Sequence, residues 1–421
     1  MSRVPKHRCL RCGQDCKRNS SLVAHLQNKT VCAPILKNAR RSTLLKKCLL
    51  EGGGGQNDNG NAVANPNFGN VVCLGEYGGV SCGNLSCYLL QIGTDEEDGR
   101  PEYLCLDGGS PIDGLWIYNR NHPDDKIDLK QIKGFVVSHC HLDHVAGLAV
   151  MTPATYGWKP RPALIASKKV MKELRAHIFN DILWPSILWD NFDRLPLLLT
   201  SNVKDENFVA HEVAKVRNVT VSADYVFHGN DKGSSVFYIT DNVSKKTVVY
   251  FGDVTSVEHM KMESNPKARL ELDHVWNRVA KMDVTSIFME CAFTNKISML
   301  FGHMNPKLLK EEIERYISLR PSQSPFNLFV THMKPAPNGD ETDRETIMSE
   351  VTKSLKDYAY INIMFLRQGE RRMLARQIVP STPPTFASAS ASASASAPAL
   401  VNKIDISFRG DRTGSKTVFH R

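Results

Sequence analysis

Three histidines and one aspartate lie within six consecutive positions near residue 140, in the segment His139-Cys140-His141-Leu142-Asp143-His144. This segment follows a mostly apolar run over residues 132–138, so we expect it to stand at the end of a β-strand. Histidines two positions apart on an extended segment point the same way, so His139 and His141 can bind one metal ion. Asp143 and His144 can turn towards a second ion, and two adjacent ions suit the hydrolysis of a phosphate ester.

The alternative for this segment is a loop whose side chains are satisfied by hydrogen bonds or solvent. We favour a metal site because imidazoles and a carboxylate this close together at a strand end suit metal coordination. Cys140 lies between two expected ligands and should point to the opposite face of the strand. We therefore expect Cys140 to pack rather than to take part in chemistry.

The chain has 421 residues, which is enough for one α/β enzyme with additional segments. No apolar stretch approaches the ~18 residues of a membrane span, and the first residues lack the apolar core of a secretory signal. We therefore expect an intracellular protein, cytoplasmic or alternatively nuclear, without a membrane partner. In such a compartment the eleven cysteines should be free thiols or metal ligands rather than disulfides.

Basic charge is concentrated at the two ends of the chain. Residues 1–50 contain twelve Lys or Arg and one acidic residue, a net charge of +11. Residues 401–421 contain five basic and two acidic residues, a net charge of +3. Because the whole chain carries +9, residues 51–400 carry −5 by subtraction. A mildly acidic catalytic region suits a small substrate better than a polyanion.

The amino-terminal segment contains a second set of metal-ligand spacings. Cys9 and Cys12 are followed by His25 and Cys32, which can close a tetrahedral zinc site. Residues 19–26 predict a short helix, and the segment resembles a Cys2His2-type zinc finger whose last ligand is cysteine. We expect one structural zinc ion and a nucleic-acid or protein partner here. The alternatives are a structural zinc module without such a partner and a basic tail without metal.

Low-complexity sequence separates the ends of the chain from its middle. The Gly/Asn-rich run over residues 52–65 and the Ala/Ser alternation over residues 387–397 cannot bury enough apolar surface to fold. We therefore predict four parts: a zinc-finger-like module over 1–35, a flexible basic and Gly/Asn-rich linker over 36–66, a catalytic domain over 67–378, and a disordered low-complexity and basic tail over 379–421.

In the middle region, short β-rich apolar runs alternate with stretches of helical character, which predicts an α/β fold. The clearest expected strands cover residues 103–106, 236–239, 247–251, 287–289 and 328–330. Four residues able to bind metal or move protons lie within two positions of such strand ends: Asp107, Asp253, Glu290 and His332. Sheet-based enzymes gather their site residues there, so we expect these side chains to approach one another.

Together, the motifs of this region resemble the class-II cyclic-nucleotide phosphodiesterases, a family of the metallo-β-lactamase superfold. The His139–His144 motif is followed by Gly147-Leu148 and Thr152-Pro153, in which Thr replaces the usual Ser. Further blocks occur in the family's order: Leu106-Asp107-Gly108-Gly109-Ser110, His228-Gly229, Phe251-Gly252-Asp253, Phe301-Gly302-His303-Met304-Asn305-Pro306 and Thr331-His332-Met333-Lys334-Pro335. The resemblance spans roughly 310 residues. It implies an α/β fold of the αββα sandwich type with a dinuclear zinc centre at one edge.

The resemblance also implies a role for each ligand. One zinc ion would be held by His139, His141 and His228, the other by Asp143, His144 and His332, and Asp253 would bridge both. By itself, a His-Gly pair such as His228-Gly229 is more typical of a turn, and its role depends on its place in the order of motifs.

The resemblance further implies a proton donor, and three other features stay open. His303 would protonate the leaving 3′ oxygen and Glu290 would orient it, although His303 could instead be a ligand or a helix-cap residue. Asp107 could serve a tight turn at Gly108-Gly109 or lie near the metals. We expect Lys334 to be solvated rather than to contact a substrate phosphate. Aromatic residues in the range 184–192 could stack on a nucleobase or pack in the core.

The function implied by the resemblance is hydrolysis of 3′,5′-cyclic nucleotides, cAMP and also cGMP, to 5′ monophosphates, which would terminate cyclic-nucleotide signalling. A ribonuclease Z-like RNA phosphodiesterase recruited through the zinc finger is the alternative, but the acidic middle region argues against it. A third hypothesis is a zinc-finger scaffold whose enzyme domain has decayed, and the complete ligand set argues against that. The ligands alone do not exclude a thioester or lactone hydrolase.

Overall fold

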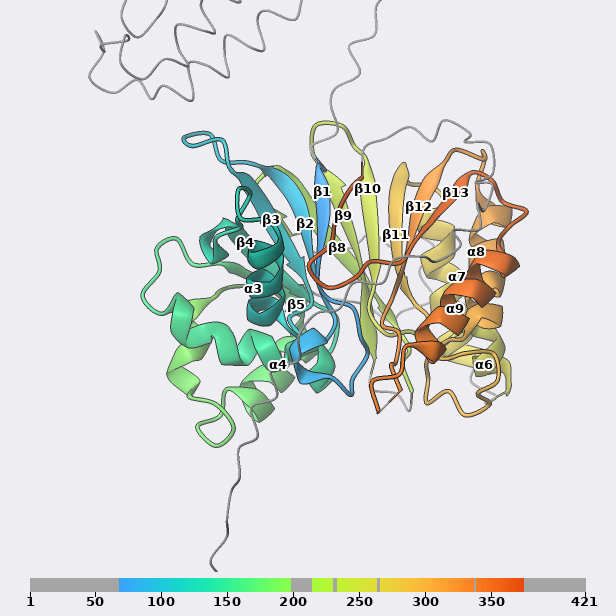
Figure 1. The fold of residues 1–421 in the computed structure, drawn as a ribbon, viewed down its shortest axis with the longest axis horizontal. Helices are drawn as coiled ribbons and strands as arrows, with labels where there is room; N and C mark the ends of the chain where they lie inside the picture. Colours follow the sequence, from blue (N-terminus) through green and yellow to red (C-terminus); the bar gives the residue numbers. More distant parts are fainter. Residues whose placement is uncertain (1–67, 198–213, 230–232, 263–265, 337, 375–421) are drawn as a thin grey trace, which may run out of the picture. The chain divides into compact units, whose positions relative to one another are not determined.

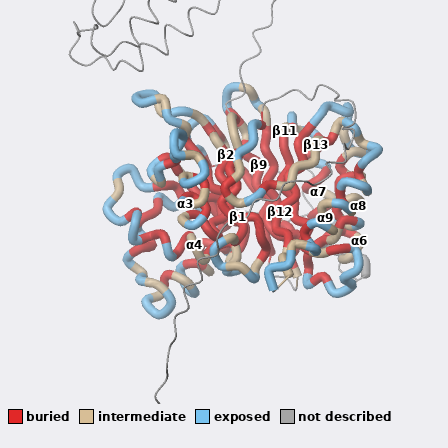
Figure 2. Tube along the Cα trace, viewed as in Figure 1, coloured by how far each residue is buried: buried red, intermediate tan, exposed pale blue. Residues whose placement is uncertain are grey.

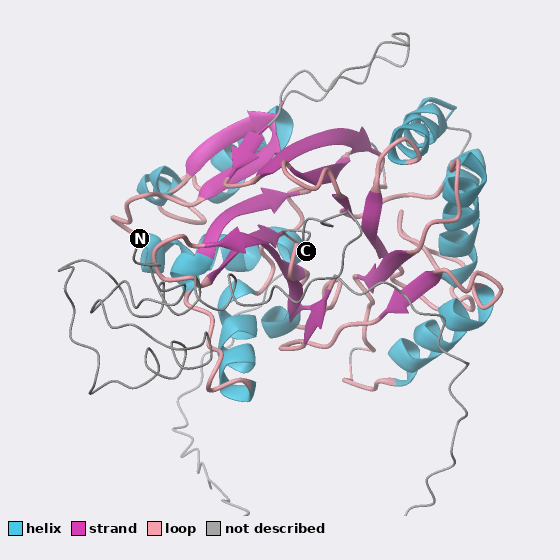
Figure 3. Cartoon of the chain, turned by 90° about the horizontal axis from the view of Figure 1, so that it is seen from above, coloured by secondary structure: helices cyan, strands magenta, loops and turns pink. Residues whose placement is uncertain are grey.

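The computed structural model describes residues 68–374 except 198–213, 230–232, 263–265 and 337. The predicted zinc-finger-like module, the linker up to residue 66 and the predicted tail from residue 379 lie outside the described residues. The described part forms two mixed β-sheets that pack face to face, with helices on both outer faces (Figure 1). The view from above in Figure 3 shows helices on either side of the strands.

The first sheet has the strand order β14-β1-β2-β3-β4-β5-β6. Neighbouring strands run parallel from β3 to β6 and antiparallel among β14, β1, β2 and β3. Its strands are β1 (Asn70–Gly75), β2 (Cys87–Thr94), β3 (Pro101–Leu106), β4 (Ile132–Val137), β5 (Ala163–Ser167), β6 (Asp193–Leu197) and β14 (Arg371–Met373).

The second sheet has the strand order β13-β12-β11-β10-β9-β8-β7. Strands β10 to β13 are parallel, and β7 to β10 pair antiparallel. Its strands are β7 (Ala214–Val216), β8 (Val219–Val226), β9 (Ser234–Asp241), β10 (Thr247–Phe251), β11 (Val284–Glu290), β12 (Phe326–Thr331) and β13 (Ile361–Met364).

Helices cover the outer face of each sheet (Figure 1). The first sheet is covered by α3 (Pro111–Asn121), α4 (Leu142–Met151) and α5 (Lys168–Glu173). The second is covered by α6 (Val257–Met262), α7 (Pro266–Val279), α8 (Pro306–Leu319) and α9 (Thr342–Ser354). Short helical turns lie at Cys82–Asn84, Leu129–Gln131, Thr152–Thr155, Leu174–Ile178 and Ser186–Asn191.

The sequence around α8 explains where that helix begins and which face it buries. Asn305 caps the helix by accepting a hydrogen bond from the Leu308 backbone N–H, and Pro306 occupies the first turn, where its missing N–H costs nothing. Leu309, Ile313 and Tyr316 then repeat at helical spacing and are all buried. This arrangement fixes the end of the loop that carries His303.

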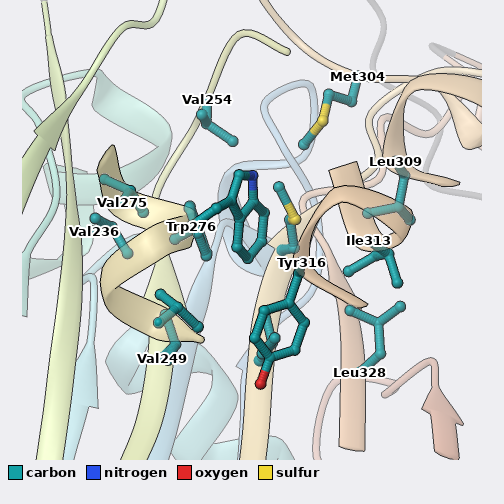
Figure 4. Close-up of a cluster of buried hydrophobic side chains, with 14 of the residues drawn as sticks. Val236, Val249, Val254, Val275, Trp276, Met304, Leu309, Ile313, Tyr316 and Leu328 are labelled. Atoms are coloured by element: carbon teal, nitrogen blue, oxygen red, sulfur yellow. The ribbon is translucent and has the colours of Figure 1, made fainter. Parts of the chain in front are cut away.

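Three apolar clusters hold the layers together, one between the sheets and one beneath each helical layer. The buried residues run through the centre of the described part, as the red trace in Figure 2 shows. Figure 4 shows the cluster under α7 and α8, where Trp276 stacks on Tyr316 with ring centroids 5.5 Å apart. Trp276 Nε1 also donates to Glu312 at 2.7 Å, so its buried polar group is satisfied. The strand ends that carry the site therefore stand on a rigid base.

The fold expected from the sequence is confirmed. Residues 103–106, 236–239, 247–251, 287–289 and 328–330 lie in β3, β9, β10, β11 and β12. The two packed sheets with outer helices form the αββα sandwich of the metallo-β-lactamase fold. Among the described residues, six cysteines are free thiols, and no helix is long and apolar enough to cross a membrane.

Candidate metal centre

The carboxyl ends of strands from both sheets meet at one edge of the sandwich. Asp107 follows β3 and His139 follows β4 in the first sheet, whereas Asp253 follows β10, Glu290 ends β11 and His332 follows β12 in the second. These strands are parallel within each sheet, so their ends project side chains into the same space. The expected approach of the strand-end residues is therefore confirmed.

Three groups of ligand atoms form at this edge among the described residues; two of them share Asp253, and the third joins His228, Glu290 and His303. The first group contains His139, His141, His228 and Asp253, and the second contains Asp143, His144, Asp253 and His332. Within each group the ligand atoms lie within 4.8 Å of one another. Asp253 is buried, and its Oδ2 is 3.6 Å from both His139 Nε2 and His228 Nε2. Its Oδ1 is 3.2 Å from His144 Nε2 and 3.1 Å from His332 Nε2.

The His139–His144 segment folds as a strand end, a short turn and a helix start. Strand β4 ends at Val137, and helix α4 begins at Leu142. Asp143 is in the first turn of α4, where the helix dipole favours a negative charge. The rings of His139 and His141 are 4.4 Å apart, and both belong to the first ligand group. Cys140 is partly buried and packs against the cluster beneath α4 and α5, as expected.

Asp107 orients two of the histidines, which the sequence left undecided. It accepts a hydrogen bond from His144 Nδ1 at 2.6 Å and from Ser138 Oγ at 2.8 Å. Because the Ser138 hydroxyl donates to Asp107, it is free to accept from His139 Nδ1, which lies 3.1 Å away. With a metal ion bound, both imidazoles would therefore carry their proton on Nδ1 and present a bare Nε2 to the centre.

Asp107 also takes part in the tight turn that was its other expected role. Its backbone has φ of +55°, and Gly108 N and Gly109 O bond to His144 O and Gly147 N of helix α4. A Cβ at Gly109 would lie 2.4 Å from the Asp143 carbonyl oxygen, so only glycine permits this approach. The two roles considered for Asp107 are thus fulfilled together.

The electrostatics of the centre fit a bound cation. Burial, followed by the nearby charge of His144, lowers the pKa of His139, and burial with His228 lowers the pKa of His141 to about 4. Burial also lowers the pKa of His228, so these three histidines are neutral near pH 7. Burial opposes a charge on His144, but Asp253, Asp107 and Asp143 raise its pKa. This surplus of negative charge is what divalent cations would neutralise.

Unsatisfied buried atoms point to the same conclusion. Among the described residues, His139 Nε2, His144 Nε2 and both carboxylate oxygens of Asp253 are buried without a hydrogen-bond partner. His144 Nε2 and Asp253 Oδ1 are 3.2 Å apart, although both present lone pairs when His144 is protonated on Nδ1. Two acceptors at this distance repel each other unless a cation lies beside them. The residues present therefore fit a metal ion in each of the two groups that contain Asp253.

His332 reaches the centre through an unusual backbone conformation. Its φ is +59°, which a residue with a bulky side chain rarely adopts. Its Nε2 lies 3.1 Å from Asp143 Oδ2 and 3.1 Å from Asp253 Oδ1. The ring packs directly on Gly78, where a Cβ would lie 2.3 Å from His332 Cε1. Gly78 was part of no predicted site, because the position of a glycine in the sequence does not reveal which side chain approaches it.

His303 lies beside His228 of the first group and is held by Glu290. The His303 and His228 rings are 4.7 Å apart, and His303 Nδ1 donates to Glu290 Oε2 at 2.9 Å. Glu290 is buried and also accepts from the Val254 backbone N–H at 2.7 Å. Burial would lower the pKa of His303, but the charges of Glu290 and Asp253 raise it. His303 can therefore carry a proton at its free Nε2 near neutral pH.

Two expectations about neighbouring residues are resolved. Lys334 was expected to be solvated, and that is wrong: it is half-buried and donates from Nζ to the Gly78 carbonyl oxygen at 2.7 Å. Of the aromatic residues in the range 184–192, Trp189 and Phe192 are buried in the core, and Trp184 donates to Thr152. These aromatic side chains follow the core-packing alternative.

An apolar rim on the loop before His303 was not singled out in the sequence. Phe301 and Met299 are 69% and 65% exposed beside a hollow of about 560 Å³ that also touches Gly229 and Gly302. Phe301 has a backbone φ of +50°. The carbonyl oxygen of the next residue, Gly302, accepts hydrogen bonds from Thr255 Oγ1 at 2.9 Å and from His228 Nδ1 at 3.3 Å. Exposed apolar groups next to such a centre can contact a planar ring of a ligand.

The described part has the metallo-β-lactamase fold, with a His/Asp centre at one edge that fits metal ions. The sequence model of the class-II cAMP phosphodiesterases matches residues 125–369, more than half of the chain. The chain therefore belongs to the class-II cAMP phosphodiesterase family, and it is an enzyme of the cyclic-nucleotide phosphodiesterase class.

Similar proteins and structures agree with this assignment. A probable 3′,5′-cyclic-nucleotide phosphodiesterase of Yersinia pestis is 26% identical, over 71% of this chain and 88% of its own length. A 3′,5′-cyclic-nucleotide phosphodiesterase of Schizosaccharomyces pombe is 25% identical, over 71% of this chain and 91% of its own. The crystal structure of unliganded yeast PDE1 shares the fold, with a TM-score of 0.57, 19% identity and coverage of 72% of this chain and 99% of that one.

Proposed function

We propose that the centre holds two zinc ions and hydrolyses 3′,5′-cAMP to 5′-AMP, with 3′,5′-cGMP as a second substrate. The observation that carries this proposal is the membership of Asp253 in both ligand groups, because one carboxylate can then bridge two ions. Ligand sets of imidazoles with a few carboxylates suit zinc. The names of the Yersinia pestis and Schizosaccharomyces pombe relatives support a 3′,5′-cyclic nucleotide as substrate.

The residues of the chain divide the work between binding and proton transfer. Bound zinc ions would supply Lewis acidity at the phosphate and make a water more acidic. His139, His141 and His228 would hold one ion, and Asp143, His144 and His332 the other. Asp107 would keep His139 and His144 in the tautomer that leaves Nε2 bare.

Departure of the leaving group depends on His303. Attack of water opposite the ribose 3′ oxygen breaks the P–O3′ bond and leaves the phosphate on the 5′ oxygen. His303 would donate its Nε2 proton to the departing 3′ oxygen, and Glu290 would hold the ring through Nδ1. The charge of Glu290 raises the pKa of His303 and so favours the protonated form of its ring. Turnover should therefore depend most directly on His303 and Glu290, together with Asp143 as a ligand of the second ion.

The amino-terminal module is a separate proposal, because it lies outside the described residues. Cys9, Cys12, His25 and Cys32 would bind one structural zinc ion, and the module would contact a nucleic acid or a protein. A purified fragment of residues 1–50 that retains no zinc after dialysis would exclude this module.

The substrate class can be tested with the purified full-length protein loaded with zinc. The protein is incubated separately with 3′,5′-cAMP, 3′,5′-cGMP, a short single-stranded RNA and a small thioester, and products are separated by chromatography. We expect 5′-AMP and 5′-GMP, with little turnover of RNA or thioester. Preferential cleavage of RNA would instead support the ribonuclease Z-like alternative, and preferential cleavage of the thioester would contradict the proposed substrate.

A further inference from the structure

A basic hollow lies at the end of the sandwich opposite the metal centre. Its volume is about 570 Å³, and it forms between the start of β4, the loop before β5 and the turn joining β7 to β8. Ile132, at the start of β4, lines the hollow, whereas His139 lies beyond the other end of this strand. Seven residues of near-extended chain separate the two positions by roughly 20 Å. The hollow is therefore distinct from the metal centre.

Cationic side chains dominate the wall of this hollow. Its lining contains five cations, one tryptophan and no acidic residue; these six are Lys130, Lys133, Lys159, Arg161, Arg217 and Trp158. The concentration is notable because residues 51–400 carry a net charge of −5. Like charges this close repel one another, so the arrangement favours a bound anion.

A buried carboxylate beneath the hollow positions two of the cations. Glu102 on β3 is 3% exposed, and its Oε1 lies 2.7 Å from Arg217 Nη2 and 3.4 Å from Lys133 Nζ. Arg217 holds φ of +55° in the turn between β7 and β8, a conformation that is uncommon for arginine. Glu102 compensates one of the five positive charges. Backbone hydrogen bonds lower the pKa of Asp95, and Lys133 and Arg217 also help to lower it, so a smaller surplus of positive charge is left for a ligand.

The aromatic residue of the wall adds a second kind of contact. Trp158 is half-buried, and Lys130 Nζ lies 5.8 Å from the centre of its ring. Lysine and arginine side chains bind phosphate oxygens, while an indole can stack on a nucleobase. The volume lies within the range of small-molecule sites. A cyclic nucleotide has a single negative charge and would compensate only part of the surplus of positive charge.

We propose that this hollow is a binding site for a nucleoside polyphosphate, a ligand that has three to four negative charges and a planar base. The phosphates would contact Lys159, Arg161 and the positioned pair Lys133 and Arg217, and the base would lie against Trp158. This site does not depend on the proposed catalytic function, because none of its residues belongs to the metal centre.

The test measures binding of ATP to the zinc-loaded full-length protein by equilibrium dialysis at about 0.1 M salt. The double variant Lys159→Glu/Arg161→Glu should weaken ATP binding by at least about tenfold while cAMP turnover is unchanged. The control Lys281→Glu/Lys356→Glu makes the same change in net charge at exposed positions outside the hollow and should leave ATP affinity nearly unchanged. Circular dichroism establishes that both variants are folded.

Two further arms test the identity of the ligand. Trp158→Leu should weaken binding of ATP more than binding of inorganic tripolyphosphate, because only ATP carries a base. The proposal is overturned if ATP does not bind, or if the Lys159→Glu/Arg161→Glu variant binds ATP as tightly as the native protein. Equal affinity for tripolyphosphate and ATP would exclude the nucleoside. Displacement of ATP by single-stranded oligonucleotides with an affinity that rises with their length would assign the hollow to nucleic acid instead.

Discussion

Asp107 Oδ2 accepts a hydrogen bond from His144 Nδ1 at 2.6 Å, and neither side chain is exposed to solvent. The same carboxylate group accepts from the backbone N–H of Ser138 at 2.7 Å, from the Ser138 hydroxyl and from the Tyr250 hydroxyl. One aspartate at the end of β3 therefore controls the orientation and tautomer of a histidine on α4. It acts on the centre without belonging to any of the groups of ligand atoms.

Replacing Asp107 tests this control. Asp107→Asn should reduce zinc affinity and turnover by about 10- to 100-fold, because His144 loses the acceptor that keeps its Nε2 bare. Zinc retained after dialysis against graded concentrations of chelator gives the affinity. Asp241→Asn is the matched control, since Asp241 is also buried but caps the turn after β9. Equal zinc retention in the native protein and Asp107→Asn would contradict the positioning role.

Gly78 should be indispensable for the position of His332. In Gly78→Ala the new methyl group would lie 2.3 Å from His332 Cε1, so the ring must move away from Asp143 and Asp253. A displacement of this kind should reduce turnover roughly a hundredfold. Gly83→Ala is the control, because a Cβ at Gly83 meets no atom within 4 Å. Comparable kcat values for the two variants would show that His332 does not need this close contact.

His303→Ala separates proton donation from metal binding. The proposed role predicts a fall in kcat of about 10²- to 10⁴-fold, because the 3′ oxygen would leave without a proton. Zinc content of the catalytic centre should not change. Metal analysis is made on a protein that also carries Cys9→Ser and Cys12→Ser, so that the predicted amino-terminal site does not contribute. Loss of one zinc ion would identify His303 as a ligand instead.

The pH profile of kcat tests the influence of Glu290 on His303. The proton donor acts in its protonated form, so kcat should fall as pH rises through the raised pKa of His303. Glu290→Gln removes the nearest negative charge that raises this pKa, so the alkaline fall should begin at a lower pH. Glu312→Gln changes a buried carboxylate in the α8 core and should leave the profile in place. An unshifted alkaline limb in Glu290→Gln would contradict the assigned pair.

The sequence predicted those parts of the site that are formed by residues close together in the chain. Histidines two apart after an apolar run indicate a metal site without further information, and the short β-rich runs predicted strands whose ends now carry Asp253, Glu290 and His332. The grouping of ligands came from the family resemblance, since no spacing reveals that His228 approaches His139. Their rings are 5.2 Å apart although 89 residues separate them in sequence.

The features of the site that the sequence did not predict depend on contacts between segments that are distant in sequence. The sequence could not decide whether Asp107 serves a tight turn or the metal centre, because an aspartate before two glycines suits both roles. Lys334 was expected to be solvated because most lysines are, and only the fold shows that its ammonium group donates a hydrogen bond to the Gly78 carbonyl oxygen. The basic hollow joins loops of both sheets, so its five cations are scattered in sequence and form no motif.

The account is tested most directly by conversion of 3′,5′-cAMP by the zinc-loaded protein, with the native sequence compared with Asp143→Ala. Product is followed by chromatography, and metal content is measured on the same samples. We predict that the native protein forms 5′-AMP and that Asp143→Ala, which lacks one ligand of the second group, loses this activity together with part of its zinc. Absence of cAMP turnover by native protein that holds both zinc ions, or full activity in Asp143→Ala, would contradict the account.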